Sequence, residues 1–172
     1  MNLLQEDFQR YPEGVNPPKF WIYYRKQRES RLRCIRRFYR RRFYRECKKN
    51  LIEIGTPNIG GGMFINHPYL ITINKDAVLG RNINIHKGVT IGQENRGSRK
   101  GAPVIGDNVW IGVNATIVGK INVGNDVLIA PNTYVNCNIP DHSVVFGNPC
   151  VIKHADYATE GYINRVVKSA ES

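Results

Sequence analysis

The sequence has no long apolar run, and this absence excludes a membrane-spanning helix, which needs roughly 20 consecutive apolar residues. Residues 1–7 show neither the basic start nor the apolar stretch of a signal peptide. The four cysteines include no C-x-x-C pair, so the spacing indicates neither a zinc site nor a redox motif. We therefore expect a cytoplasmic protein whose four thiols are reduced and which requires no metal.

What the sequence does contain describes one globular domain with a short appendage. Its 172 residues are 41% hydrophobic and 23% charged, which is enough to bury a core without disulfides. The 16 glycines and nine prolines argue against an all-helical bundle. We divide the chain into a helical segment over 1–53, a main domain over 54–152 and a tail over 153–172.

The positive charge is concentrated in one segment. The formal net charge is +11, and residues 25–49 hold 13 of the 25 Lys and Arg against two of the 14 Asp and Glu. The rest of the chain therefore has 12 basic and 12 acidic residues and is balanced. The basicity belongs to this appendage and not to the main domain.

Apolar residues in the basic segment recur at helical spacing. They are Leu32, Ile35, Phe38, Tyr39 and Phe43. Spacings of three and four predict an amphipathic helix, and we place its start near Pro17-Pro18. The apolar stripe either packs on the main domain or, with the arginines, contacts an anionic surface such as a membrane or a charged glycan. Binding to nucleic acid is the weakest of the three interpretations, because no nucleic-acid motif is present.

From residue 59 onward, aliphatic residues repeat at intervals of six. The two series are Ile73, Leu79, Ile85, Ile91 and Ile105, Ile111, Ile117, Val123, Ile129, Val135. A second apolar or small residue follows four places later at Ala77, Ile83, Val89, Val109, Ala115, Ile121 and Val127. Neither a helix nor a long strand has this period, whereas short strands joined by Gly- and Asn-rich turns do. The sequence therefore predicts a three-sided parallel β-helix with its aliphatic residues stacked inside.

Two insertions interrupt the repeat. The step from Ile65 to Ile73 is eight residues, and the step from Ile91 to Ile105 is 14. The longer insertion gives a protruding polar loop over 92–104, which we expect to be exposed.

Two histidines fall beside the first insertion. Counting faces places Ile85 directly above Ile65, so His67 and His86 should lie on the same side of the prism, one coil apart. An imidazole is the side chain best suited to take a proton from a hydroxyl near neutral pH. Each histidine could instead be a turn residue bonded to a backbone carbonyl, and this alternative stays open. His142 and His154 are interpreted as surface residues.

Several stretches form a recognisable set: Ile65-Asn66-His67-Pro68, Gly88-Val89-Thr90-Ile91-Gly92-Gln93, Asn95-Arg96-Gly97, the segment Ile105 to Gly112, and Gly147-Asn148-Pro149. With these motifs, the segment from about Ile54 to Ile152 resembles the hexapeptide-repeat acyltransferases. The resemblance is to the branch with serine acetyltransferases and capsule-type polysaccharide O-acetyltransferases. Residues 7–11 and 160–164 resemble flanking signatures of the capsule type. The resemblance implies a left-handed coil, a homotrimer and acetyl-CoA as the donor.

The resemblance also implies roles for individual residues. His67 aligns with the base, His86 is a second catalytic candidate, and Asn66, Gly92 and Gln93 are candidates for contacts with the acceptor or the oxyanion. Candidates for binding acetyl-CoA are Arg96, Arg99, Lys100, Gly112, Lys120, Ala130 and Lys153.

Two departures from the serine acetyltransferases favour a sugar acceptor. Asn66 stands where those enzymes have an Asp before the base, and Ala102 stands where they have a second histidine. The leading hypothesis is thus an O-acetyltransferase acting on a sugar hydroxyl of a surface polysaccharide or its precursor.

In this hypothesis the basic segment would hold the enzyme at the inner face of the membrane. Serine O-acetylation is the alternative within the branch. A non-catalytic solenoid scaffold with an anion-binding helix is the alternative from another class.

Overall fold

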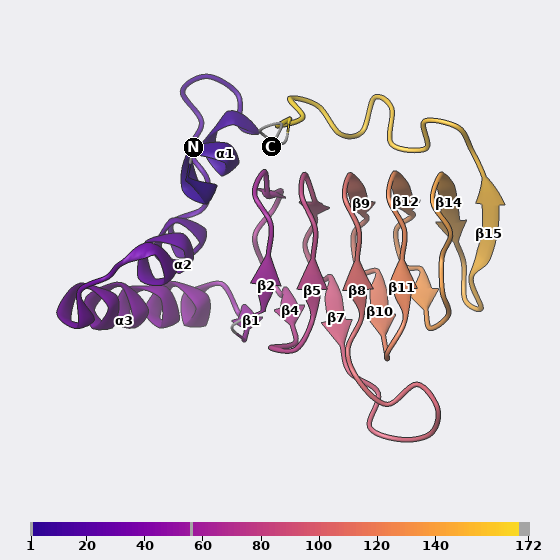
Figure 1. The fold of residues 1–172 in the computed structure, drawn as a ribbon, viewed down its shortest axis with the longest axis horizontal. Coiled ribbons are helices and arrows are strands. Elements are labelled where there is room, and N and C mark those ends of the chain that lie inside the picture. Colours follow the sequence, from indigo (N-terminus) through magenta and orange to yellow (C-terminus); the bar gives the residue numbers. More distant parts are fainter. Residues whose placement is uncertain (1, 56, 169–172) are drawn as a thin grey trace.

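A computed structural model describes residues 2–55 and 57–168, and it consists of a helical segment followed by a solenoid of short strands (Figure 1). The helices are α1 (Leu3–Gln9), α2 (Lys19–Glu29) and α3 (Arg33–Lys49). The strands are β1 (Glu53–Ile54), β2 (Asn58–Ile59), β3 (Phe64–Ile65), β4 (Thr72–Ile73), β5 (Val78–Leu79), β6 (Asn84–Ile85), β7 (Thr90–Gly92), β8 (Val104–Ile105), β9 (Val109–Ile111), β10 (Thr116–Val118), β11 (Asn122–Val123), β12 (Val127–Ile129), β13 (Tyr134–Val135), β14 (Ser143–Phe146) and β15 (Val151–His154).

The strands stack into three sheets that form the faces of a prism. Face 1 contains β3, β6, β9, β12, β14 and β15, face 2 contains β1, β4, β7, β10 and β13, and face 3 contains β2, β5, β8 and β11. All pairings are parallel except the last, between β14 and β15. From β1 to β13 every third strand returns to the same face, which confirms the β-helix predicted from the repeat of six.

The aliphatic repeat is the core of this prism. Each of the ten predicted residues from Ile73 to Val135 is buried, with at most 3% of its surface exposed. The strand register places equivalent residues on top of one another, as with Ile65 over Ile85 and Ile85 over Ile111. Burial of each side chain contributes roughly 1.5–3 kcal/mol, so the ladder is the main source of stability in this part of the chain.

Asn and Asp side chains build the turns between faces. Asn82, Asn108 and Asp126 occupy equivalent positions between faces 3 and 1, and each has a positive φ of 52° to 56°. Asn and Asp tolerate this left-handed conformation better than other residues with a side chain. We call this edge of the prism the tail corner, because the C-terminal residues lie along it.

A helix begins just after Pro17-Pro18, as predicted, but the structure has two helices where a single helix was predicted through the basic segment 25–49. Two helices, α2 and α3, pack against each other, because the backbone is extended at Ser30 and Leu32. Only part of the predicted apolar stripe is covered. Phe43 is buried, whereas Leu32, Ile35 and Phe38 are 60%, 40% and 50% exposed. The aromatic residues of α2, including the buried Trp21 and its stacking partner Tyr24, take the place that the stripe was expected to fill.

Asp7 joins the helical segment to the first coil of the solenoid. Its carboxylate accepts hydrogen bonds from Trp21 Nε1 at 2.8 Å, Arg25 Nε at 2.6 Å and the Met63 backbone N–H at 2.8 Å. The Arg25 guanidinium also donates to the carbonyl of Ile59 at 2.8 Å. Asp7 and Arg25 are both at most 1% exposed, so this ion pair is fully buried.

The tail expected over 153–172 begins within β15 and then packs against the prism as far as residue 168, and residues 169–172 lie outside the described residues. β15 pairs antiparallel with β14, and the following residues run back along the solenoid toward α1 (Figure 1). Asp126 accepts hydrogen bonds from the backbone N–H groups of Ala158 and Thr159, both at 2.9 Å. Asn82 exchanges hydrogen bonds with the backbone of Val167 at 2.9 and 3.1 Å.

The four cysteines are free thiols, as predicted, although two of them are neighbours: the Sγ atoms of Cys137 and Cys150 are 3.7 Å apart. Among the described residues, no helix combines the length and apolarity that crossing a bilayer requires.

Replacing the buried carboxylate should strongly destabilise the protein. In Asp7→Asn the Arg25 guanidinium loses its charged partner, and we expect the free energy of unfolding to fall by about 3–5 kcal/mol in urea titrations. Asp76→Asn is the matched control, because Asp76 pairs with Lys75 on the surface, where both side chains are more than half exposed. Such pairs contribute at most about 1 kcal/mol. Equal effects of the two substitutions would contradict the role given to Asp7.

Candidate functional site

The edge at which face 1 passes into face 2 carries the two histidines. His67 follows β3 and His86 follows β6 on the next coil, while Gly112 and Ala130 follow β9 and β12 on the coils beyond. We call this edge the histidine corner. The count of faces along the repeat is therefore correct, and four of the predicted site residues fall in one line.

His67 is presented outward by the two-residue insertion. Its side chain is exposed, and its backbone adopts a left-handed conformation with φ of 51°. The backbone N–H of Tyr69 donates to the His67 carbonyl at 2.8 Å, and the N–H of Leu70 donates to the Asn50 carbonyl at 3.1 Å. These bonds hold the inserted turn against the end of the helical segment. The conformation is strained for a non-glycine residue, as is common where a chain presents a functional side chain.

Unlike His67, His86 is buried, and its ring is fixed by its neighbours. It is 9% exposed, and its ring lies 4.6 Å from that of Trp110. Nδ1 lies 2.9 Å from the carbonyl oxygen of Ile111, and a carbonyl can only accept, so Nδ1 carries the proton. Burial lowers the pKa of His86, and the nearby His67 imidazole lowers it further. His86 is therefore a neutral, oriented ring beside His67, which fits a positioning role better than proton transfer to a substrate.

The long insertion forms a hairpin at the next edge of the prism, where face 2 passes into face 3. We call this edge the loop corner. Glu94 and Gly101 exchange two backbone hydrogen bonds of 3.0 Å at the base of the hairpin. The Gln93 side chain bonds to Asn74 at 3.2 Å and Asn95 at 2.7 Å, so it is engaged within the loop.

The cations proposed for the CoA phosphates divide into two places. Arg96, Arg99 and Lys100 are exposed on the hairpin, and the backbone N–H of Lys120 donates to the Arg99 carbonyl at 2.9 Å. These four residues form one basic surface at the loop corner. Lys153 lies apart on β15, with its Nζ 5.6 Å from the centre of the Phe146 ring.

Within one chain, the structure does not bring all candidate residues together. His67 and Asn66 are at the histidine corner, whereas Gly92 and Gln93 are at the loop corner, across the width of face 2. Gly112 has a structural reason for being glycine: a Cβ there would lie 2.6 Å from the nitrogen of Pro131 on the next coil. Close stacking of coils therefore explains Gly112 without a ligand.

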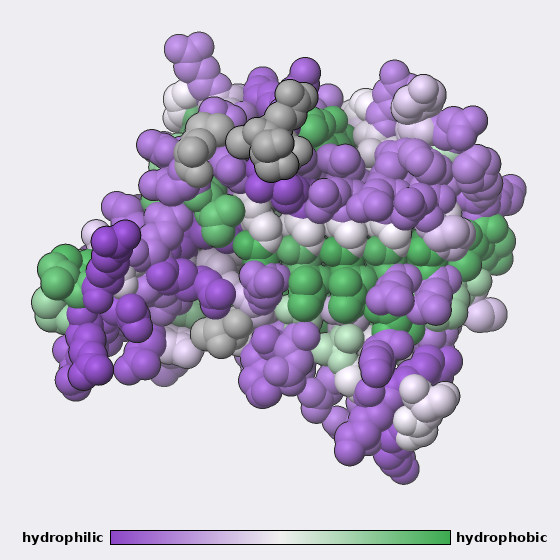
Figure 2. Space-filling view, in the orientation of Figure 1, coloured by the Kyte–Doolittle hydropathy of each residue, from purple (hydrophilic) through white to green (hydrophobic). Residues whose placement is uncertain are grey.

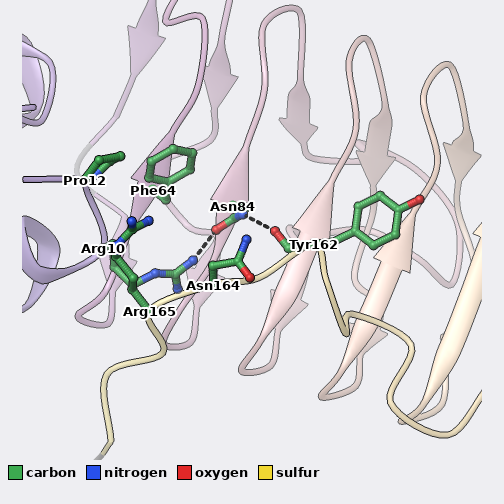
Figure 3. A pocket seen from close by; sticks show the side chains of 7 residues that line it. All are labelled: Arg10, Pro12, Phe64, Asn84, Tyr162, Asn164 and Arg165. Atoms are coloured by element: carbon green, nitrogen blue, oxygen red, sulfur yellow. Dashed lines mark hydrogen bonds between the residues drawn. The ribbon is translucent and has the colours of Figure 1, made fainter.

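Sequence reasoning gave no binding role to a group of residues on face 1 beneath the tail. Arg10, Phe64, Asn84, Tyr162 and Arg165 line a small pocket there (Figure 3). Tyr162 also packs edge-on against Trp110 at 5.2 Å. The available signal was the pair of flanking signatures at residues 7–11 and 160–164, which lie at distant positions in the sequence and meet only in the fold.

Comparison with known proteins identifies the repeat. The family described as bacterial transferase hexapeptide (six repeats) matches residues 102–137. Serine acetyltransferase from Staphylococcus aureus (strain Mu50 / ATCC 700699) is 36% identical over 91 residues, which are 53% of this chain and 43% of that protein. Serine acetyltransferase 2 from Arabidopsis thaliana is 35% identical over 91 residues, covering 53% of this chain and 28% of that protein. Residues 102–137 therefore match the hexapeptide-repeat family, and the chain is similar to serine acetyltransferases over 91 residues.

Solved structures of serine acetyltransferases agree with the fold. A serine acetyltransferase from Neisseria gonorrhoeae is 27% identical with a TM-score of 0.67, covering 90% of this chain and 66% of that one. A serine acetyltransferase from Brucella abortus strain S19 has a TM-score of 0.73 at 24% identity, covering 89% of this chain and 68% of that one, which is a likeness of fold. This hexapeptide-repeat protein spans less than half the length of the curated relatives it matches.

Burial of His86 should make stability depend on pH. Its folded-state pKa is lowered from 6.5, so below pH 6.5 the unfolded state takes up a proton that the folded state does not. We expect the free energy of unfolding to decrease as the pH falls below 6.5, by at most about 1.4 kcal/mol per pH unit from this residue. The decrease should be shallower in His86→Gln than in the control His154→Gln, which removes an exposed ring. An unchanged slope in His86→Gln would contradict this origin.

Proposed function

We propose that this protein is an acetyl-CoA-dependent O-acetyltransferase with His67 as the general base. The carrying observation is the exposed His67 imidazole, which a strained insertion presents at the corner of a hexapeptide-repeat prism beside the ordered ring of His86. The names of the relatives support the reaction class.

The reaction needs one proton acceptor and one site for negative charge. His67 takes the proton of the acceptor hydroxyl as its oxygen forms a bond to the acetyl carbonyl carbon of the donor. The carbon–sulfur bond then breaks, and the protonated His67 returns its proton to the leaving thiolate. Between these steps a backbone N–H near Gly92 or Gln93 donates a hydrogen bond to the carbonyl oxygen and stabilises its negative charge.

This chemistry supports assembly of several copies. The histidine corner and the loop corner are separated by face 2 in one chain, so His67 of one copy meets the Gly92 region only if a neighbour contributes its loop corner. We propose a homotrimer with the reacting groups at the contacts between prisms. The exposed residues Val78 (37%) and Val104 (46%) of face 3, which lie next to the loop corner, provide apolar surface for such contacts.

The relatives favour serine as the acceptor. Both curated relatives named above are serine acetyltransferases, and neither of them is named for the sugar acceptor expected from the sequence. Serine is therefore the first candidate. A sugar hydroxyl is the second candidate because of two residues of this chain, Asn66 before His67 and Ala102 before Pro103, which remove the acidic and imidazole groups of the serine enzymes.

Loss of the His67 imidazole should abolish the reaction without loss of the fold. A positioned general base contributes about 10²–10⁴ in rate, so His67→Ala should lower kcat at least about 100-fold in an assay of thiol release from acetyl-CoA. His154→Ala is the matched control, since that histidine is exposed on β15. Calorimetry with CoA and light scattering should show unchanged donor binding and assembly. Wild-type turnover by His67→Ala would remove this residue from the mechanism.

The same assay separates the two acceptors. Free serine and purified surface glycan are supplied in parallel, and mass spectrometry detects the acetylated product. Turnover of serine supports the first candidate, and turnover of glycan alone supports the second. A protein that binds no CoA and releases no thiol with either acceptor is a scaffold.

We also propose that α3 holds the protein at an anionic membrane surface. Leu32, Ile35 and Phe38 are exposed at the outer end of the helical hairpin, where Figure 2 shows an apolar group among hydrophilic side chains. Phe38, Arg41, Arg42 and Arg45 line one hollow on this helix, with the Arg42 guanidinium carbon 5.0 Å from the centre of the Phe38 ring. Apolar side chains surrounded by arginines match the acyl and headgroup layers of an anionic leaflet.

Vesicle sedimentation tests this surface. Binding is expected to vesicles of mixed phosphatidylcholine and phosphatidylserine and not to phosphatidylcholine alone. Each cation near such a surface contributes about 1 kcal/mol to binding. A triple variant with Gln in place of Arg37, Arg41 and Arg45 should therefore bind these vesicles about 100-fold more weakly. The control is a triple variant with Gln in place of Arg96, Arg99 and Lys100. It removes the same charge from the loop between β7 and β8, and its binding to the vesicles should be unchanged. Salt-sensitive binding to duplex DNA without vesicle binding would overturn the assignment. It would also be overturned if the oligomer dissociated when Leu32, Ile35 and Phe38 were changed to Ser, because these residues would then lie at a contact between copies of the chain.

A further inference from the structure

The pocket on face 1 is built from both ends of the described chain. Arg10 follows α1, Phe64 and Asn84 belong to β3 and β6, and Tyr162 and Arg165 belong to the tail that crosses them (Figure 3). Its volume is about 80 Å³. This is enough space for one small polar group.

Arg10 is a buried cation that the fold leaves without a carboxylate. Arg10 is 2% exposed, and among the described residues its guanidinium donates to three neutral acceptors: the carbonyl of Gly62 at 3.3 Å, Asn82 Oδ1 at 3.3 Å and Asn84 Oδ1 at 2.5 Å. Its Nε is buried with no partner among the described residues. Asp7, three residues before Arg10, forms its ion pair with Arg25 instead.

Arg165 brings a second guanidinium to the same pocket. The tail backbone is fixed on both sides of it: Asn84 donates to the Tyr162 carbonyl at 3.1 Å, and the Val167 N–H donates to Asn82 Oδ1 at 2.9 Å. Arg10, Asn164 and Arg165 all line this pocket, and in Figure 3 the two arginine side chains overlap in the view, with the Arg10 guanidinium reaching Asn84. The pocket lining contains no Asp or Glu. The buried Arg10 and the exposed Arg165 therefore line one small pocket whose lining has no carboxylate, and Asp7 is the acid whose charge acts on Arg10.

We propose that this pocket binds a small oxyanion, the carboxylate or phosphate group of a ligand. Guanidinium groups present several N–H donors in a planar fork that suits both groups. The unpartnered Nε of Arg10 and the Asn164 amide supply further donors. Phe64 and Pro12 form the apolar part of the lining. They offer no side-chain hydrogen bond, so the polar contacts of the pocket are all directed to the anionic group of the ligand.

The electrostatics of Arg10 agree with this function. Burial lowers the pKa of Arg10 from 12.5 to about 10, because the charged form has lost water without gaining a full counterion. A bound anion would provide that counterion. The anion pocket is separate from the proposed catalytic histidine, which stands at the corner beyond the end of β3.

Titration with inorganic phosphate and with acetate tests the pocket and distinguishes the two ligand classes. Each is added to the full chain while the melting temperature and the binding heat are measured. The test variant is Arg165→Asn, because Arg165 has φ of 55° and Asn tolerates this conformation. Lys168→Asn is the matched control: it removes one exposed cation from the same tail, outside the pocket lining.

Saturable binding of at least one anion is expected in the wild type and in Lys168→Asn, with an affinity at least tenfold weaker in Arg165→Asn. The anion that binds more tightly identifies the group as carboxylate or phosphate. Arg10→Lys, checked for folding by circular dichroism, should weaken binding as well. Absence of saturable binding of both anions to the wild type would overturn the proposal. Equal weakening by Lys168→Asn and Arg165→Asn would also overturn it, since it would indicate attraction to net charge alone. None of these outcomes depends on acetyl transfer.

Discussion

The stacking of buried aliphatic side chains at every sixth residue determines the geometry of everything else in this protein. Because Ile65, Ile85 and Ile111 lie on top of one another, the residues that follow them are brought into line along one edge of the prism. The two histidines, far apart on an extended chain, thus become neighbours without any direct bond between them. A one-residue slip in register would move His67 to a different side of its coil and separate it from His86.

The two histidines show how one scaffold gives the same side chain two different characters. His67 lies in an insertion that breaks the repeat, so its ring stands in water and is free to change partners. His86 lies in the regular repeat, where the next coil supplies both a carbonyl for Nδ1 and the Trp110 ring. The difference arises from the backbone path and not from residue type. It also explains why interruptions in a regular solenoid are the places to look for chemistry.

The sequence predicted the features that depend on spacing and missed those that depend on contacts between distant segments. The period of six gave the prism, its three faces and the stacking of His67 and His86, because each follows from counting residues. The break between α2 and α3 was missed, since the aromatic residues of α2 compete with the apolar stripe of α3 for the same packing surface. The meeting of Arg10 with Arg165 was also missed, because no local pattern records where a tail returns along a solenoid.

The returning tail changes how the coils depend on one another. In a simple solenoid each coil touches only its neighbours, and the end coils can open independently of the rest. Here residues 158–167 are bonded to Asp126 on a late coil and to Asn82 and Asn84 on an early one. The terminal coil therefore cannot peel away without also releasing bonds at the opposite end of the prism. Because of these tail contacts, the coils are expected to unfold cooperatively and not one by one from the end of the solenoid.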